Sequence, residues 1–93
     1  MIKSFGDAET RQLWQEERSR RIPANLRKAA LKKLQMLNAA ASLSDLLVPP
    51  GNRLERLRGD REGRHSIRIN QQYRVCFAWR ESNAYDVEIT DYH

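Results

Sequence analysis

The hydrophobic pattern of this 93-residue chain changes its period once, at Pro49-Pro50-Gly51. Before this tripeptide, apolar residues recur at spacings of three and four, as on one face of an α-helix, at Leu26, Ala30, Leu34, Leu37 and Ala41. After it, apolar and polar residues alternate, which is the pattern of half-buried β-strands. The chain is therefore expected to form one small α+β domain over residues 1–93, with its main helices before its main strands.

The spacing of turn residues predicts the individual elements. The first half is expected to hold a short strand at 2–5, helices at 7–21 and 23–41, and a brief helical turn at 42–48. The second half is expected to hold four strands, at 53–57, 64–69, 73–79 and 84–90. The loops between these strands are so short that neighbouring strands must pair antiparallel. Two to three helices are then expected on one face of the sheet, with the other face open.

Strand alternation assigns side chains to the two faces of this sheet. In the central strands, Arg64, Arg68 and Arg74 are expected to point away from the apolar side, next to small residues. His65 is expected on the core side. The aromatic residues that alternation turns inward are Tyr73, Phe77, Trp79 and Tyr85. Arginines beside small residues form a shallow cationic surface, which suits a phosphate backbone.

The positive charge of the chain favours binding of an anionic ligand. Its formal net charge is +5, and residues 53–74 contain seven arginines and no lysine. A guanidinium grips a phosphate with two parallel hydrogen bonds, whereas an ammonium acts as a point charge. We therefore expect RNA binding by Arg56, Arg64, Arg68 and Arg74. The alternative interpretation is a solvated basic sheet face without a ligand.

The last residues of the chain, Asp91, Tyr92 and His93, bring a carboxylate, a phenol and an imidazole together. A histidine side chain titrates near neutral pH and suits general acid–base catalysis. With arginines to stabilise negative charge, such groups can make a ribose 2′-OH attack the adjacent phosphate, without a metal or a cofactor. The alternative is that a Tyr-His end only closes the last strand.

Most other enzyme classes lack their motifs in this sequence. It contains no phosphate-binding glycine loop, no dinucleotide-binding turn, no His or Cys pair with metal-ligand spacing and no serine nucleophile motif. The lone Cys76 cannot form an internal disulfide, and the first residues do not resemble a secretion signal. No apolar run is long enough to span a membrane. We therefore expect a cytoplasmic protein with no metal site and no membrane contact.

Four segments in order resemble the HigB branch of the RelE/ParE superfamily of bacterial toxins: Met-Ile-Lys-Ser-Phe at 1–5, Leu-Arg-Gly-Asp-Arg-Glu-Gly at 57–63, Tyr-Arg-Val-Cys-Phe at 73–77 and Asp-Tyr-His at 91–93. The resemblance implies a RelE-like fold and a metal-independent endoribonuclease that cuts mRNA in the A site of the small ribosomal subunit. It also implies a cognate helix-turn-helix antitoxin, which neutralises the toxin and represses their operon with it. Operator DNA would be contacted only through that complex.

The same resemblance implies catalytic roles by position. The family's terminal Asp, Tyr and His correspond to Asp91, Tyr92 and His93, and Arg58 stands where the family has a catalytic lysine before Gly-Asp. Glu55 stands where the family has a second catalytic histidine. Either Glu55 serves as the general base in its place, or the activity is lower than in toxins that have the histidine.

Two other functions stay open at this point. One is a ParE-like inhibitor of DNA gyrase, which shares the fold. The other is a non-catalytic RNA-binding module, which would tolerate loss of His93 and bind with a steep salt dependence.

Overall fold

A four-stranded antiparallel meander forms the centre of the structure, a computed structural model that describes residues 1–59 and 63–92. Its strands β1 (Glu55–Arg56), β2 (Arg64–Arg68), β3 (Tyr73–Arg80) and β4 (Asn83–Asp91) lie side by side in chain order. Before them come α1 (Ala8–Glu16), α2 (Ala24–Ala39) and the 3₁₀ turns η1 (Leu43–Leu47) and η2 (Pro50–Asn52). The expected α+β fold with an antiparallel meander is confirmed.

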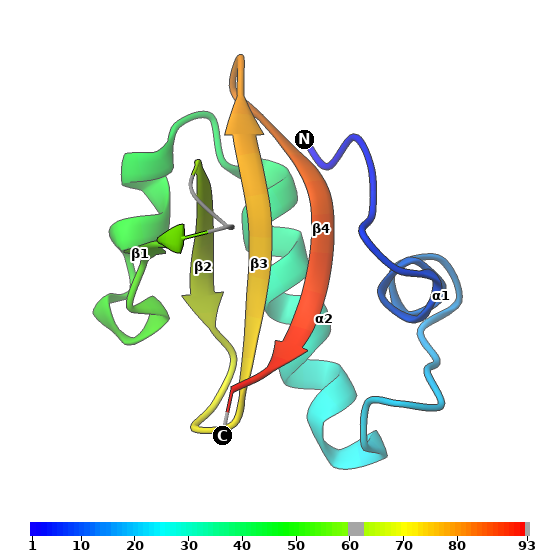
Figure 1. Ribbon diagram of the computed structural model, residues 1–93. Helices are drawn as coiled ribbons and strands as arrows, with labels where there is room; N and C mark the ends of the chain where they lie inside the picture. Colours follow the sequence, from blue (N-terminus) through cyan, green and yellow to red (C-terminus); the bar gives the residue numbers. More distant parts are fainter. Residues whose placement is uncertain (60–62, 93) are drawn as a thin grey trace.

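Helix α2 covers one face of this sheet, and α1 lies beside β4 (Figure 1). The core forms between α2 and the sheet from buried aliphatic and aromatic side chains, among them Leu34, Leu37, Ile67, Val75, Phe77 and Val87. In the described part of the chain, no helix covers the opposite face, which we call the open face (Figure 1). None of the described helices is long and apolar enough to cross a bilayer.

The first residues extend the sheet beyond β4 but form no regular strand. Ile2 and Phe5 make isolated parallel bridges to Ala84 and Val87 of β4. The Lys3 N–H donates to the Ala84 carbonyl at 2.8 Å, which holds the segment against the edge of β4. The strand expected at 2–5 is thus reduced to two bridges, because a helix follows immediately after Asp7.

Helix α1 ends earlier than its sequence indicated. Its start is as expected, since the Asp7 carboxylate accepts a hydrogen bond from the Thr10 N–H at 2.7 Å. It stops at Glu16 because Glu17 adopts a left-handed conformation with φ 58 and donates its N–H to the Leu13 carbonyl. The buried Thr10 hydroxyl accepts the Ile89 N–H at 3.0 Å and ties the helix to β4.

The expected strand at 53–57 is only two residues long. The turn η2 continues to Asn52, and Arg53 then adopts a left-handed conformation with φ 45. This conformation interrupts a regular extended strand, and pairing with β2 begins at Glu55. The Asn52 side chain fixes the preceding loop: its amide Nδ2 donates to the Leu46 and Val48 carbonyls at 3.2 and 3.4 Å.

Tyr85 does not enter the core, so its predicted inward position is wrong. The register between β3 and β4 shifts between Cys76 and Ala78, and Asp86 has φ 53. This bulge inserts one residue, so that Ala84 and Val87 are both buried while Tyr85 pairs with Ala78. The guanidinium of Arg80 lies 4.2 Å from the centre of the Tyr85 ring.

The buried Asn52 amide predicts a large stability effect at a position outside the hydrophobic core. Asn52→Ala is expected to lower the free energy of unfolding by about 2 kcal/mol, because the buried Leu46 carbonyl loses its donor. Gln35→Ala on the exposed face of α2 is the matched control and should change the value by less than about 0.5 kcal/mol. Urea unfolding followed by circular dichroism measures both, and equal midpoints for the two variants would contradict the role of Asn52.

Candidate functional site

A cavity of about 290 Å³ lies on the open face, where η2, the β2–β3 turn and the end of β4 meet. Among the described residues, its lining consists of Arg53, Glu55, Arg68, Asn70, Gln71, Arg74 and Tyr92. Arginines outnumber carboxylates in this lining, so the cavity suits an anion. We call it the tyrosine cavity.

Arg74 is the most firmly held cation of the tyrosine cavity. Its residue is only 8% exposed, and its Nε donates to the Ser66 hydroxyl at 2.8 Å. Its Nη2 donates to the Arg53 carbonyl at 2.5 Å. The Glu55 carboxylate lies 3.9 Å from Nη1 and is itself 57% exposed, so that solvent screens this ion pair. Arg74 is therefore fixed mainly by the neutral oxygens of Ser66 and Arg53. Its positive charge is left to attract an anionic ligand.

Two arginines face each other across the strands beside this cavity. Arg68 of β2 is the direct register partner of Arg74 of β3. Like charges at directly opposite positions of an antiparallel pair are destabilising. Arg68 is held there by a hydrogen bond from its Nε to the Asn70 carbonyl at 3.0 Å. An anion bound between the two guanidinium groups would remove their repulsion.

The β2–β3 turn positions the end of the chain. The Asn70 carboxamide oxygen accepts the N–H groups of Gln72 and Tyr73 at 2.9 and 2.7 Å, which shapes the turn. The Tyr92 N–H donates to the Gln72 carbonyl at 2.6 Å, and the Gln72 side chain donates to the Asp91 carboxylate at 3.1 Å. Asp91 and Tyr92 are thus both bonded to this turn.

The Tyr92 side chain reaches back over the open face. Its hydroxyl lies 3.8 Å from the Cys76 sulfur, and its ring centre lies 6.0 Å from the Arg74 guanidinium carbon. Tyr92 is 39% exposed and lines the cavity. The geometry therefore brings a phenol, buried and half-buried guanidinium groups and a carboxylate to one place.

The structure brings together only some of the residues expected at a site. Glu55, Arg68, Arg74 and Tyr92 line the tyrosine cavity, and Asp91 precedes Tyr92 at the end of β4. Arg56 and Arg58 instead line a separate cavity of about 400 Å³ near Gly59. Alternation explains this, because Glu55 pairs with Ser66 whereas Arg56 pairs with His65, on the other face. His93 lies outside the described residues.

Arg64 faces the open side as expected, but it is held by carboxylates away from the tyrosine cavity. Its guanidinium lies 3.3 Å from the Asp86 carboxylate and 3.7 Å from that of Glu88. Its expected role in RNA binding stays a prediction, because these ion pairs hold its guanidinium toward β4 and Arg64 does not line the tyrosine cavity. No sequence pattern indicates this pairing, since it depends on the register of β4 and its bulge.

Sequence reasoning also missed residues of the site. Arg53, Asn70 and Gln71 line the tyrosine cavity, and Ser66 holds Arg74. In the sequence, Asn70 and Gln71 indicate only a turn between the strands expected at 64–69 and 73–79. Arg53 reaches the cavity through its left-handed backbone, which no sequence signal indicated. The alternation of β2 could have revealed Ser66, because it falls between Arg64 and Arg68 on the same face.

His65 is placed on the core side, as expected. Its ring centre is 6.0 Å from that of Phe77. Burial lowers the pKa of His65 below its ordinary value, and the nearby positive charge of Arg56 lowers it further. Within the described residues, no three His, Cys, Asp or Glu side chains gather closely enough to hold a metal ion.

The comparisons with known proteins first define the class of fold. A chain of the YoeB-YefM complex from Staphylococcus aureus has a TM-score of 0.62 to this structure, with 14% sequence identity, and the match covers 100% of this chain and 98% of that chain. At this identity the likeness shows the fold alone, and the fold is RelE-like.

The family follows from the sequence comparisons. A family model described as "RelE-like toxin of type II toxin-antitoxin system HigB" matches residues 3–93. Toxin HigB-1 of Vibrio cholerae serotype O1 is 44% identical over 80 residues, covering 85% of this chain and 84% of that protein. Endoribonuclease HigB of Proteus vulgaris is 31% identical over 97 aligned positions, covering 100% of both chains. The chain therefore belongs to the HigB-like toxins of type II toxin–antitoxin systems.

Proposed function

We propose that this toxin is an endoribonuclease that cuts mRNA in the ribosomal A site and thereby stops translation and growth. The observation that carries the proposal is the tyrosine cavity, in which Arg68 and Arg74 oppose each other beside the exposed Tyr92 phenol. The relative from Proteus vulgaris is named an endoribonuclease, which supports the same chemistry.

In the proposed reaction, the 2′-OH of a ribose attacks the phosphorus of the adjacent phosphodiester. The proton of the 2′-OH goes to a general base, and the departing 5′-oxygen takes a proton from a general acid, so that a 2′,3′-cyclic phosphate and a 5′-OH result. His93 and Tyr92 are the proposed proton carriers, with Glu55 as an alternative base at the cavity rim. Arg53, Arg68 and Arg74 would stabilise the extra negative charge of the pentavalent state.

The size of the cavity supports dependence on the ribosome. About 290 Å³ lies just below the usual range for ligand pockets, so the cavity can hold the reacting phosphate and its immediate surroundings but not a long stretch of RNA. Arg64 does not extend the cationic lining of the cavity, because its guanidinium is paired with Asp86 and Glu88. We therefore propose that the ribosome supplies the orientation of the mRNA that this surface does not.

The proposed partners follow from the family. We propose a cognate helix-turn-helix antitoxin that neutralises the toxin in the cytoplasm and represses their operon together with it. Operator DNA would be bound by that complex through the antitoxin. The structural neighbour from Staphylococcus aureus was solved as a complex of two proteins, which supports the expectation of a partner.

Primer extension on translating ribosomes tests the proposal. The intact chain is expected to cut mRNA only when ribosomes are present, and deletion of His93 is expected to lower cleavage by about 100-fold or more. Arg58→Ala tests the catalytic role that the resemblance implies for this residue of the separate cavity near Gly59: a loss of at least about tenfold would support the role, and an unchanged rate would contradict it. Growth arrest without any RNA cleavage, accompanied by DNA damage, would instead indicate gyrase inhibition.

A further inference from the structure

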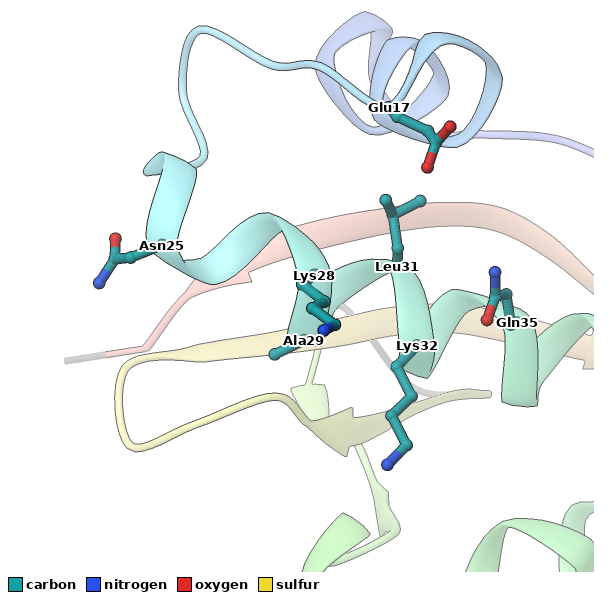
Figure 2. A pocket seen from close by; sticks show the side chains of 7 residues that line it. All are labelled: Glu17, Asn25, Lys28, Ala29, Leu31, Lys32 and Gln35. Atoms are coloured by element: carbon teal, nitrogen blue, oxygen red, sulfur yellow. The ribbon is translucent and has the colours of Figure 1, made fainter.

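A groove of about 760 Å³ lies between the C-terminal end of α1 and the face of α2 that points away from the sheet (Figure 2). Its lining consists of Glu17, Asn25, Lys28, Ala29, Leu31, Lys32 and Gln35. Figure 2 shows Leu31 extending from α2 toward α1, where Glu17 points back at it. We call this the helix groove.

Positive charge exceeds negative charge at this groove, because Lys28 and Lys32 face a single carboxylate, Glu17, among its described lining residues. Between Ala24 and Ala39 the helix contains one arginine, three lysines and no acidic residue. Lys28 and Lys32 are four residues apart on one helix face, where like charges destabilise a helix. Within the described part of the chain, no ion pair involves either of them. Burial lowers the pKa of the neighbouring Lys33, and the charge of Lys32 lowers it further.

The position of the basic residues along α2 is also unfavourable for the stability of the helix. Arg27 and Lys28 lie in the first half of α2, at the end where the helix macrodipole is positive. Exposed helix faces normally mix acidic and basic residues, and α1 does so with Glu9 and Arg11. Since Lys28 and Lys32 are exposed, packing does not account for this run of positive charge. Carboxylates of a binding partner would relieve it.

The chemistry of the helix groove differs from that of the tyrosine cavity. The tyrosine cavity offers arginines and a phenol, which suit phosphate and bases. The helix groove offers Lys28 and Lys32 beside Leu31 and Ala29, with one carboxylate, Glu17, and no aromatic side chain among its described lining residues. A partly exposed apolar surface beside two lysines suits an amphipathic peptide with acidic residues next to an apolar anchor. It suits RNA less well.

We propose that the helix groove binds an acidic, amphipathic segment of the antitoxin. An apolar side chain of this segment packs on Leu31 and Ala29, and its carboxylates pair with Lys28 and Lys32. The identity of the partner rests on the proposed toxin–antitoxin function, whereas the charge and shape of the groove do not. Because α2 lies between the helix groove and the sheet and the two cavities share no described lining residue, substitutions in the groove are expected to leave the tyrosine cavity intact.

The test is a calorimetric titration of the full-length toxin with its co-encoded antitoxin. The double variant Lys28→Glu/Lys32→Glu is expected to bind about 100-fold more weakly than the unmodified toxin, because two attractive contacts become repulsive. The matched control is Lys3→Glu/Arg11→Glu, which changes the net charge equally at exposed positions outside the groove. It should bind within about threefold of the unmodified toxin.

Ribosome-dependent cleavage by the same purified variants separates this proposal from the proposed function. Both double variants are expected to cut mRNA at the unmodified rate when no antitoxin is present. If the groove variant keeps its antitoxin affinity within about threefold, or both double variants lose affinity alike, the groove proposal is overturned. A groove variant that binds antitoxin normally but cuts mRNA poorly would show an RNA surface, which also overturns it. If the unmodified toxin cuts no mRNA, the proposed function fails while the affinity comparison still decides the groove.

Discussion

Arg74→Lys is expected to lower ribosome-dependent mRNA cleavage by about 100-fold or more, although the positive charge is kept. Lysine has no second nitrogen with which to bond the Ser66 hydroxyl and the Arg53 carbonyl at once, as Nε and Nη2 of Arg74 do. Its ammonium would therefore not be held at the place where charge develops on the phosphate. Primer extension on translating ribosomes, at matched toxin concentrations, gives the rate.

The controls for this variant separate catalysis from folding. Ser66→Ala removes one hydrogen bond of Arg74 but keeps the guanidinium and its bond to the Arg53 carbonyl, so a loss of about tenfold or less is expected. Urea unfolding of both variants shows how much of any loss arises from destabilisation, because Arg74 and Ser66 are both buried. If Arg74→Lys cuts at the unmodified rate while folded, the forked contacts of Arg74 play no part in catalysis.

Local patterns predicted those parts of the fold and site that depend on neighbours in sequence. The spacing of Leu34 and Leu37 identified the buried face of α2, and alternation placed Arg68 and Arg74 on the open face. Helical and strand periods are properties of the backbone, so they can be recognised in a short window of sequence. The cationic character of the site was therefore predictable from the sequence.

Features that depend on one residue's backbone or on distant contacts were not predictable in this way. The left-handed conformations of Arg53 and Asp86 occur in residues other than glycine, so composition does not indicate them. The first brings Arg53 to the tyrosine cavity, and the second turns Tyr85 out of the core. The bond from the Gln72 side chain to the Asp91 carboxylate joins residues 19 positions apart and is set only by the register of β3 and β4.

Tyr92→Phe is the second substitution with a large expected effect. The ring would remain about 6.0 Å from the Arg74 guanidinium carbon, so its position should persist, and only the hydroxyl is lost. Because the proposed reaction needs a proton carrier at the cavity, cleavage is expected to fall by about 100-fold. Primer extension measures the loss, and unchanged affinity for the antitoxin would show that the variant is folded.

The matched variant Cys76→Ala decides whether the Tyr92 hydroxyl acts on the substrate or only contacts Cys76 in the sheet. The Tyr92 hydroxyl lies 3.8 Å from the Cys76 sulfur, a weak contact that Cys76→Ala removes while the phenol stays. If the phenol handles a proton of the reaction, Cys76→Ala should keep cleavage within about threefold while Tyr92→Phe loses it. Equal losses in the two variants would assign the effect to the position of the ring, and an active Tyr92→Phe would leave proton transfer to His93 and Glu55.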